Sequence, residues 1–350
     1  MKPVAHALVA SGIRPTLIVT GQHEGLDLGN FGLDGFEAVR LDCPSRDDPH
    51  AHVRAVTIAM LPLLSDPPAI LAVQGDTSSA LGAALAAFTA GIPVAHVEAG
   101  LRTHDMMLPW PEEEYRTAID ANAELLFAPT EISAANLVAE KVSGEIHVTG
   151  NTGIDAVLEA ASRLPPPNPR RGTLPRMLVT CHWRESWRDG LRSIAAAVTD
   201  LAGTDCEIEF VLHPNAYVTG VMRKLLGEAP GVTLIEPCGH HELLRRMRDA
   251  DLVLSDSGGI QEEAPALGIP LLVLRDKTER PEGIAAGTSL LVGTKRDRIV
   301  REARRLLRDW RALEAMRRKV FPFGDGRAAP RIANIVADWV ERRGSERRPA

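Results

Sequence analysis

The stretch L-P-P-P-N-P-R-R-G-T-L-P-R at residues 164–176 contains five prolines and a glycine. Proline interrupts a helix and removes a hydrogen bond from the ladder of a strand, so this stretch can form neither a helix nor a central strand. We predict that it is a semi-rigid connector. Strand-like segments, about four on each side, precede and follow it. The stretch therefore predicts a chain of two similar halves.

Short apolar runs alternate with helical patterns along the chain. The runs are apolar on both faces and are bounded by turn residues, as the buried strands of a parallel sheet are. Helical patterns fill the gaps, for example at residues 78–89 and 299–313. This alternation predicts an α/β protein of the doubly wound type. The predicted strands are P-T-L-I-V-T-G, A-I-L-A-V-Q-G-D, I-P-V-A-H-V-E-A and E-L-L-F-A-P-T in the first half, and R-M-L-V-T-C-H, I-E-F-V-L-H, D-L-V-L-S-D-S-G-G and I-P-L-L-V-L-R in the second.

The composition is that of a globular protein without a strong preference for polyanions. The 350 residues are 45 % hydrophobic and carry a formal net charge of −6, which favours neither nucleic acid nor an anionic membrane surface as a partner. No apolar run is long enough to span a bilayer. The four cysteines are scattered without zinc-ligand spacing, and we expect reduced thiols in a cytoplasm.

Polar residues follow several predicted strands, at the edge where open α/β sheets bind their ligands. Asp76 follows A-I-L-A-V-Q-G, Glu98 follows I-P-V-A-H-V, and His182 and Arg184 follow R-M-L-V-T-C. An aspartate in such a place is often only a helix N-cap, whereas glutamate is not a preferred cap. His182 could serve as an acid, a base or a phosphate ligand. These residues are therefore candidates for a site.

The strongest local signal is S-D-S-G-G-I-Q-E-E-A at residues 255–264. Ser257, Gly258 and Gly259 follow a strand and open a helix, so bare N–H groups and the positive end of the helix dipole would suit a phosphate or diphosphate. The same glycines could instead serve only as a tight turn. Glu263, nearly two turns into the helix, could reach ribose hydroxyls. Arg280, after the next strand, could neutralise a diphosphate or form a surface ion pair with a neighbouring glutamate.

The segment P-W-P-E-E-E-Y-R at residues 109–116 places three carboxylates behind Pro111. Proline is favoured as the first residue of a helix, and negative charge is stabilising in the first turn. Consecutive helical residues point about 100° apart, so the three carboxylates cannot share one ligand. At most one or two of them can face a site, and Glu112 is closest to the loop that follows Glu98, with Arg116 one turn later able to hold it.

The histidines and cysteines do not have the spacing of a metal site. His96, two residues before Glu98, is expected to be buried within its strand. The adjacent His240 and His241 would point apart on a helix or a loop. We therefore predict a site that uses no metal.

Taken in order, these motifs resemble those of the UDP-N-acetylglucosamine 2-epimerase family. The resemblance runs from about residue 3 to residue 340. It implies the GT-B architecture, in which two Rossmann-like domains face each other across a cleft, and a reaction without a metal or a nicotinamide cofactor. His240 and Trp183 depart from the family pattern, which has an aromatic residue and an arginine there. The matching motifs are V-Q-G-D-T, H-V-E-A-G-L-R-T, P-W-P-E-E-E-Y-R, F-A-P-T-E, V-T-G-N-T-G-I-D-A, H-W-R-E-S, D-S-G-G-I-Q-E-E-A-P, R-D-K-T-E-R-P-E and F-G-D-G-R-A.

The resemblance implies an isomerase that interconverts UDP-GlcNAc and UDP-ManNAc. UDP would leave C1 together with the C2 proton, and would then add back to the resulting 2-acetamidoglucal with the proton on the other face. No carbonyl acidifies C2–H, so the reaction needs carboxylates near the sugar and N–H or cationic groups at the diphosphate. The residues that match the catalytic positions are Asp76, Glu98, Glu112 and His182. Glu113 and Glu114 are then expected to be helix-start charges. Those expected to bind the substrate are Arg184, Ser257, Gly258, Gly259, Glu263 and Arg280.

The resemblance also sets the expected domain limits. We expect an N-terminal Rossmann-like domain at residues 1–163, the connector at 164–176, a UDP-binding domain at 177–322, and a helix at 323–342 that crosses back to the first domain. The family opens with a strand and a G-T-R-P-E loop, whereas residues 1–12 read as a helix with Val4, Leu8 and Val9 on one face. We expect that strand and loop to be lacking.

We further expect a cytoplasmic homodimer of polysaccharide biosynthesis whose partner is its UDP-sugar substrate, with no nucleic acid and no membrane insertion. Three alternatives remain open. A hydrolysing 2-epimerase would release UDP and ManNAc. A GT-B glycosyltransferase would share the fold and the nucleotide site, although transfer does not need four acid/base residues. A nucleotide-sugar-binding protein with little turnover would follow from the missing N-terminal elements.

Overall fold

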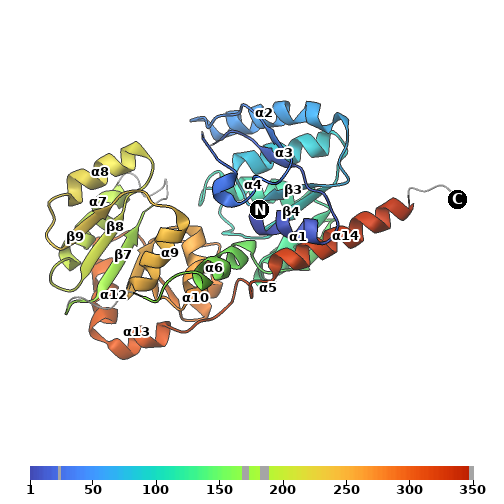
Figure 1. Cartoon of the computed structure of the whole chain (residues 1–350). Coiled ribbons are helices and arrows are strands. Elements are labelled where there is room, and N and C mark those ends of the chain that lie inside the picture. Colours follow the sequence, from blue (N-terminus) through green and yellow to red (C-terminus); the bar gives the residue numbers. More distant parts are fainter. Residues whose placement is uncertain (23–24, 168–172, 182–188, 347–350) are drawn as a thin grey trace. The chain divides into compact units, whose positions relative to one another are not determined.

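The computed structural model describes residues 1–22, 25–167, 173–181 and 189–346. The chain divides into two compact units, of which unit 1 comprises Met1–Ala156 and Phe323–Ala350 and unit 2 comprises Val157–Pro322 (Figure 1). The division falls within helix α6 (Thr152–Ser162), before the Pro-rich stretch 164–176. Residues 168–172 of that stretch lie outside the described residues.

Unit 1 contains two parallel sheets. The larger sheet has the order β3-β4-β5-β6, and β4 and β5 are buried along their whole length, as their apolar sequences predict. The smaller sheet pairs β1 with β2. In the part of the chain that the structure describes, β1 and β3 each have a single partner strand. The strands of unit 1 are β1 (Leu17–Val19), β2 (Ala38–Arg40), β3 (Leu71–Gln74), β4 (Val94–Val97), β5 (Leu125–Ala128) and β6 (Glu145–Val148).

Helices cover both faces of the larger sheet. Residues of α2, α3 and α4 form one apolar core, and residues of α1 and α14 form the other, with α14 beside α1 (Figure 1). Val4 and Leu8 are buried, but Val9 is 54 % exposed, so the prediction that it shares their face is wrong. Ala5 is buried in its place, because Val4 and Ala5 lie four and three residues before Leu8 and so share its face of the helix. The helices are α1 (Lys2–Ala10), α2 (Pro49–Met60), α3 (Ser78–Thr89), α4 (Glu112–Asp120), α5 (Glu131–Glu140) and α14 (Ala328–Glu346), with short 3₁₀ helices at Gly29–Phe31 and Leu61–Ser65.

Unit 2 is built on one six-stranded parallel sheet. Its order is β12-β11-β10-β7-β8-β9, so the chain proceeds outward from β7 in one direction and from β10 in the other. The point between β7 and β10 is therefore a topological switch point, where the carboxyl ends of the strands form a ligand-binding crevice in α/β proteins. The strands are β7 (Arg176–Thr180), β8 (Glu207–Val211), β9 (Val232–Ile235), β10 (Leu252–Ser255), β11 (Leu271–Val273) and β12 (Ser289–Leu291).

Helices also cover both faces of the sheet of unit 2, where two apolar cores lie. The helical pattern predicted at 299–313 forms two helices, α12 and α13, because Asp309 ends the first and caps the second with its side chain, which accepts from Arg311 N and Ala312 N at 3.1 Å. The helices are α7 (Asp189–Leu201), α8 (Ala216–Leu226), α9 (His240–Asp249), α10 (Gly258–Leu267), α11 (Glu282–Ala285), α12 (Arg296–Arg308) and α13 (Trp310–Met316).

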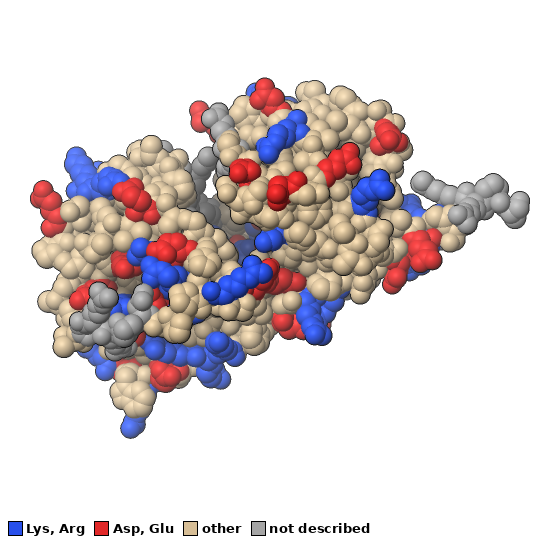
Figure 2. Space-filling model, in the orientation of Figure 1, with Lys and Arg blue, Asp and Glu red and all other residues tan. Residues whose placement is uncertain are grey.

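The charges on the surface are mixed in sign. On the face drawn in Figure 2, basic and acidic side chains lie interspersed among uncharged ones. Among the described helices, none combines the length and the apolar sequence needed to cross a membrane.

Candidate active site

Two predicted catalytic residues of unit 1 lie at one edge of the larger sheet. Asp76 follows β3 and Glu98 follows β4, and because these strands are parallel neighbours, both residues leave the sheet at the same end. A carboxylate oxygen of Glu98 lies 3.7 Å from the position that a Cβ on Gly75 would occupy. Glu98 has φ 72°, a left-handed conformation that costs a non-glycine residue about 1–2 kcal/mol. The surrounding turn must therefore hold this residue in place.

Arg116 holds the first of these carboxylates. Its buried guanidinium donates from Nε to Asp76 Oδ2 at 2.9 Å, and a second nitrogen contacts the same oxygen. A third nitrogen donates to Glu113 Oε2 at 2.8 Å. We expected Arg116 to hold Glu112, one turn before it; its described partners are Asp76 and Glu113, so it joins β3 to the first turn of α4.

Glu113 has a larger structural role than a helix-start charge. It does lie in the first turn of α4, which begins at Glu112 with Pro111 as its N-cap, but its side chain is fully buried. Its carboxylate accepts from Thr103 N at 3.0 and 3.1 Å and from His104 N at 2.9 Å. Glu113 thus ties the loop after Glu98 to α4. The position of Arg116 three residues later was the only sequence signal for this role.

The other two carboxylates of the segment are more accessible. Glu112 is half-buried at the start of α4, and the side chain of Glu114 is 45 % exposed beside His50. Tyr115 lies between them, with a buried hydroxyl that has no hydrogen-bond partner among the described residues. Burial raises the pKa of Tyr115 to about 12, and the charges of Glu114 and Glu112 act in the same direction. Sequence reasoning did not single out Tyr115.

In unit 2 the predicted phosphate turn opens α10 at the switch point. Ser257 is the N-cap residue, and its backbone N–H donates to Ser255 Oγ at 3.0 Å. A Cβ on Gly258 would lie 2.8 Å from a guanidinium nitrogen of Arg280, so Arg280 lies directly against this glycine. The structure thereby brings together the turn and the cation that the sequence placed about twenty residues apart.

Arg280 is part of a buried ion network. Its Nε donates to Glu262 Oε1 at 2.6 Å, and another guanidinium nitrogen contacts Glu279. Glu279 also accepts from Arg275 at 3.1 Å. The alternative of an ion pair with Glu279 is therefore realised, but the pair is buried and lies beneath the glycine turn. Arg280 can supply charge to a diphosphate while these carboxylates fix its orientation.

Glu263 and His240 form a separate pair on α10 and α9. His240 Nε2 lies 2.9 Å from Glu263 Oε1, and this hydrogen bond raises the pKa of His240 above its ordinary value. The second carboxylate oxygen of Glu263 is buried and has no partner among the described residues. A buried acceptor of this kind is expected to accept a hydrogen bond from a hydroxyl group of a ligand or from water.

Two predicted residues, His182 and Arg184, lie outside the described residues, as does Trp183. The chain leaves β7 at Cys181, whose buried thiol donates to Asp256 Oδ2 at 3.3 Å. Burial raises the pKa of the Cys181 thiol far above its ordinary value, and the charge of Asp256 adds to this effect. In the described part of the chain, no group of three histidine, cysteine or acidic side chains could hold a metal ion.

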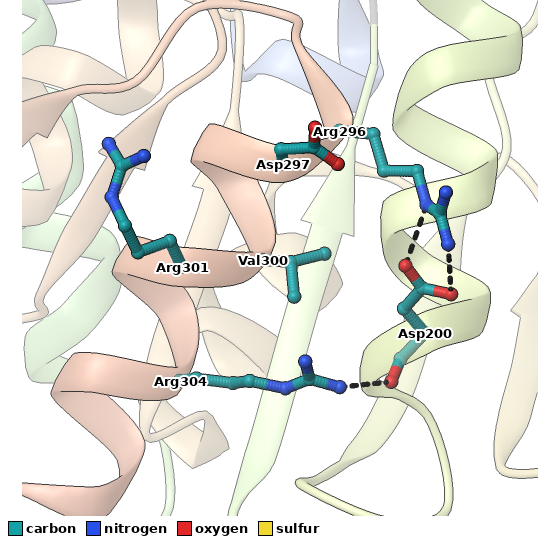
Figure 3. Close-up of a pocket in the computed structure, with 6 residues that line it drawn as sticks. All are labelled: Asp200, Arg296, Asp297, Val300, Arg301 and Arg304. Carbon is teal, nitrogen blue, oxygen red and sulfur yellow. Dashed lines mark hydrogen bonds and ion pairs between the residues drawn. The ribbon is translucent and has the colours of Figure 1, made fainter.

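A pocket of about 450 Å³ lies elsewhere in unit 2, between α7 and α12. Arg296 binds the Asp200 carboxylate at 2.6 and 2.9 Å, and Arg304 donates to the carbonyl oxygen of the same residue (Figure 3). Arg301 points away from Asp200. None of the predicted site residues lines this pocket, and two of its arginines are bound to Asp200 rather than presented to a ligand. The pocket is therefore not the candidate site.

Residues 6–337 match a family model described as UDP-N-acetylglucosamine 2-epimerase. The chain is 40 % identical over 363 residues to UDP-N-acetylglucosamine 2-epimerase of Escherichia coli (strain K12), a match that covers 96 % of this chain and 94 % of that protein. It is 33 % identical to a Neisseria meningitidis UDP-GlcNAc 2-epimerase solved with UDP-GlcNAc bound, with a TM-score of 0.90 and 96 % of each chain covered. Acinetobacter baumannii MurG, at 13 % identity and a TM-score of 0.53, shares the fold. The predicted α/β class and GT-B architecture are confirmed.

Proposed function

This chain belongs to the UDP-N-acetylglucosamine 2-epimerase family, and we propose that it interconverts UDP-GlcNAc and UDP-ManNAc. The observation that carries the proposal is the set of acidic residues at one sheet edge of unit 1, where Arg116 fixes Asp76 and the loop of Glu98 lies beside it. Epimerisation at an unactivated carbon needs groups that remove a proton from one face and return it to the other. A binding protein has no use for such a set.

The reaction proceeds by elimination and re-addition. A carboxylate takes the C2 proton while the C1–O bond breaks, the bonding electrons leave with UDP, and a 2-acetamidoglucal forms. UDP then attacks C1 and a proton returns to C2 on the opposite face. Asp76, Glu98, Glu112 and His182 carry the proton transfers in this proposal, with Arg116 as the group that orients Asp76. Tyr115, whose raised pKa keeps its hydroxyl protonated, cannot act as the base at neutral pH.

Stabilisation of the leaving group is assigned to unit 2. The N–H groups at the start of α10, beginning at the turn of Ser257, Gly258 and Gly259, donate hydrogen bonds to the diphosphate at the positive end of the helix dipole. Arg280 adds positive charge from beneath the same turn. The unpaired oxygen of Glu263 accepts a hydrogen bond from a ribose hydroxyl. Arg184 completes the set of substrate-binding residues.

Turnover of UDP-GlcNAc in D₂O, followed by ¹H NMR, tests the proposal. We expect the ManNAc epimer to form with deuterium at C2, because the returning proton comes from the solvent. Free ManNAc and UDP would identify a hydrolysing epimerase, and transfer of the sugar to an added acceptor would identify a glycosyltransferase. Epimer formation without deuterium at C2 would contradict the elimination mechanism.

We also propose that the protein is a homodimer and acts in the cytoplasm in polysaccharide biosynthesis. The motive for the location is its substrate class together with its cysteines, all four of which are free thiols. Sedimentation equilibrium tests the oligomeric state, since a dimer has twice the 37.8 kDa mass of the chain. A single species at the chain mass across the micromolar range would rule out the dimer.

A further inference from the structure

His96 is a buried histidine of β4 whose two ring nitrogens both bind acceptors. Its Nδ1 lies 2.6 Å from Asp120 Oδ1, and its Nε2 lies 2.9 Å from the carbonyl oxygen of Gly75. A backbone carbonyl and an ionised carboxylate can both accept hydrogen bonds, and neither can donate one. Both nitrogens of His96 must then carry a proton, and the ring is an imidazolium cation.

Asp120, the last residue of α4, is the counter-charge. Its second oxygen accepts from Gly100 N at 3.0 Å and from an Arg102 guanidinium nitrogen at 2.8 Å. Burial works against the charged form of Asp120, but the charges and hydrogen bonds of His96 and Arg102 outweigh it and lower the pKa of this carboxyl group. Burial likewise opposes charge on His96, and Asp120 outweighs it, so that the pKa of His96 is raised.

The charges of this network, which is buried except at Glu140, balance. Arg102 donates to Glu140 at 2.8 and 2.7 Å, which gives two cations, His96 and Arg102, against two anions, Asp120 and Glu140. Asp76 is a further anion close enough to favour the imidazolium. A balanced network with its hydrogen bonds satisfied is rigid, whereas one that lacks a member leaves a charge unpaired in the interior.

The network ends at the two turns that carry the predicted catalytic carboxylates. The Gly75 carbonyl belongs to the peptide group that joins Gly75 to Asp76, and Gly100 N lies two residues after Glu98. Both turns have left-handed residues, with φ 68° at Gly75, 72° at Glu98 and 82° at Gly100. A Cβ on Gly100 would lie 2.2 Å from the carbonyl oxygen of Ser133, so the backbone of this turn packs directly against Ser133.

We propose that His96 is the positioning residue of this site: one doubly protonated ring holds the Gly75–Asp76 turn directly and the Glu98–Gly100 turn through Asp120. His96 does not touch the substrate; it sets the separation between the carboxylates of Asp76 and Glu98. The inference rests on the proposed function of these two residues. The competing interpretation is an ion pair that stabilises the fold and has no effect on turnover, and the experiments are chosen to separate the two.

The kinetic experiment uses His96→Gln, which keeps a buried polar group of similar length. A glutamine amide can donate to only one of the two acceptors, because its carbonyl oxygen would face the other. We expect kcat to fall roughly 10- to 100-fold, as a small misplacement of reacting groups does, with KM for UDP-GlcNAc changed by less than about threefold. Calorimetry should show unchanged affinity for UDP, which is assigned to unit 2.

Met60→Ala is the control for lost stability. Met60 lies on α2 and is fully buried in the apolar core that α2, α3 and α4 form in unit 1. Its truncation destabilises this unit without altering a polar contact of either turn. The kcat of its folded fraction should equal that of the wild-type protein. An equal loss of kcat in both variants, or a kcat of His96→Gln within about threefold of the wild type, would overturn the positioning role.

Two readouts do not depend on turnover. Amide hydrogen exchange should rise at residues 75–77 and 98–102 in His96→Gln and stay unchanged there in Met60→Ala. ¹⁵N NMR of histidine-labelled full-length chain should show both ring nitrogens of His96 protonated at pH 7, where an unperturbed histidine is mostly neutral, with the signal identified among the 11 histidines by its absence in His96→Gln. An unprotonated ring nitrogen at pH 7 would disprove the imidazolium. Failure of the wild-type chain to epimerise would count against the proposed function alone.

Discussion

Glu112 and Glu114 lie two residues apart in the first turn of α4, and at the scale of single residues they give the sharpest test of the catalytic assignment. Both residues are half-buried, but one carboxylate oxygen of Glu112 is buried, whereas the side chain of Glu114 is 45 % exposed. We expect Glu112→Gln to lower kcat at least ~100-fold, as loss of an acid/base group does, and Glu114→Gln to leave it nearly unchanged. Both variants should bind UDP like the wild-type protein in calorimetry. Full activity in Glu112→Gln would remove this residue from the mechanism, and equal losses would mean that the wrong face of α4 was chosen.

Glu113 shows what the sequence could not predict at this scale. Its place in the first turn followed from the proline before it, and negative charge there is favourable in any helix. Its burial, and its bonds to the backbone of Thr103 and His104, depend on where the loop after β4 folds back. That is a long-range property without a local signature. Asp76 and Glu98, by contrast, were predictable, because residues that follow neighbouring parallel strands must emerge at one edge of the sheet.

Gly258 offers a second residue-scale prediction, in unit 2. A Cβ at this position would lie 2.8 Å from a guanidinium nitrogen of Arg280 and 3.0 Å from its central carbon. Gly258→Val would therefore displace the cation and also block the approach of a phosphate to the backbone. We expect calorimetry to show at least about a tenfold weaker affinity for UDP, equivalent to roughly 1.4 kcal/mol.

Gly220→Ala is the matched control for Gly258→Val. Gly220 lies within α8 of the same unit, and nothing lies within 4 Å of the position that its Cβ would take. This variant should bind UDP with wild-type affinity and melt at or slightly above the wild-type temperature, because alanine stabilises a helix interior by roughly 0.5–1 kcal/mol relative to glycine. Undiminished UDP binding by Gly258→Val, with the fold intact, would place the diphosphate elsewhere.

At the scale of secondary structure, the strands that the sequence did not predict are all edge strands. β2 ends the small sheet, β6 ends the larger sheet of unit 1, and β9 and β12 end the sheet of unit 2. Each is only three or four residues long, and none is buried along its whole length. The central strands β4, β5 and β10 are buried on both faces, so they read as continuous apolar runs. The four missed edge strands lack that signal, because pairing with a neighbour, rather than their own composition, makes them strands.

The small sheet of β1 and β2 should be the least protected part of the strand framework. It has three residue pairs, and its side chains are half-buried or exposed. An isolated pair of strands is at best marginally stable in water. In native-state hydrogen exchange we expect residues 17–19 and 38–40 to open with a free energy several kcal/mol below that of β4 and β5. The edge strand β6, which is one of the four strands of the larger sheet, is the internal comparison. Protection of β1 equal to that of β5 would contradict this prediction.

At the scale of the whole molecule, each unit has its own pair of apolar cores on the two faces of its own sheet. The cores of unit 1 contain residues of β3, β4 and β5, and those of unit 2 contain residues of β7, β8, β10 and β11. A unit with its own core can unfold as a cooperative body, so a chain with two of them need not melt in one step. Leu126 of β5 and Leu178 of β7 are equivalent probes, since both are fully buried in a central strand.

We therefore expect calorimetric melting to show two transitions. Leu126→Ala should lower the midpoint temperature of one transition and Leu178→Ala that of the other. Each substitution should reduce the free energy of unfolding of its unit by the roughly 2–5 kcal/mol that a leucine truncation costs in a core. UDP at about 100 times its dissociation constant should stabilise the unit that binds it by roughly 2.7 kcal/mol. On the proposed assignment, UDP raises the transition that Leu178→Ala lowers and leaves the other in place. A single transition that both variants and UDP shift equally would mean that the two units unfold as one body, and a UDP shift confined to the Leu126 transition would move the nucleotide site to unit 1.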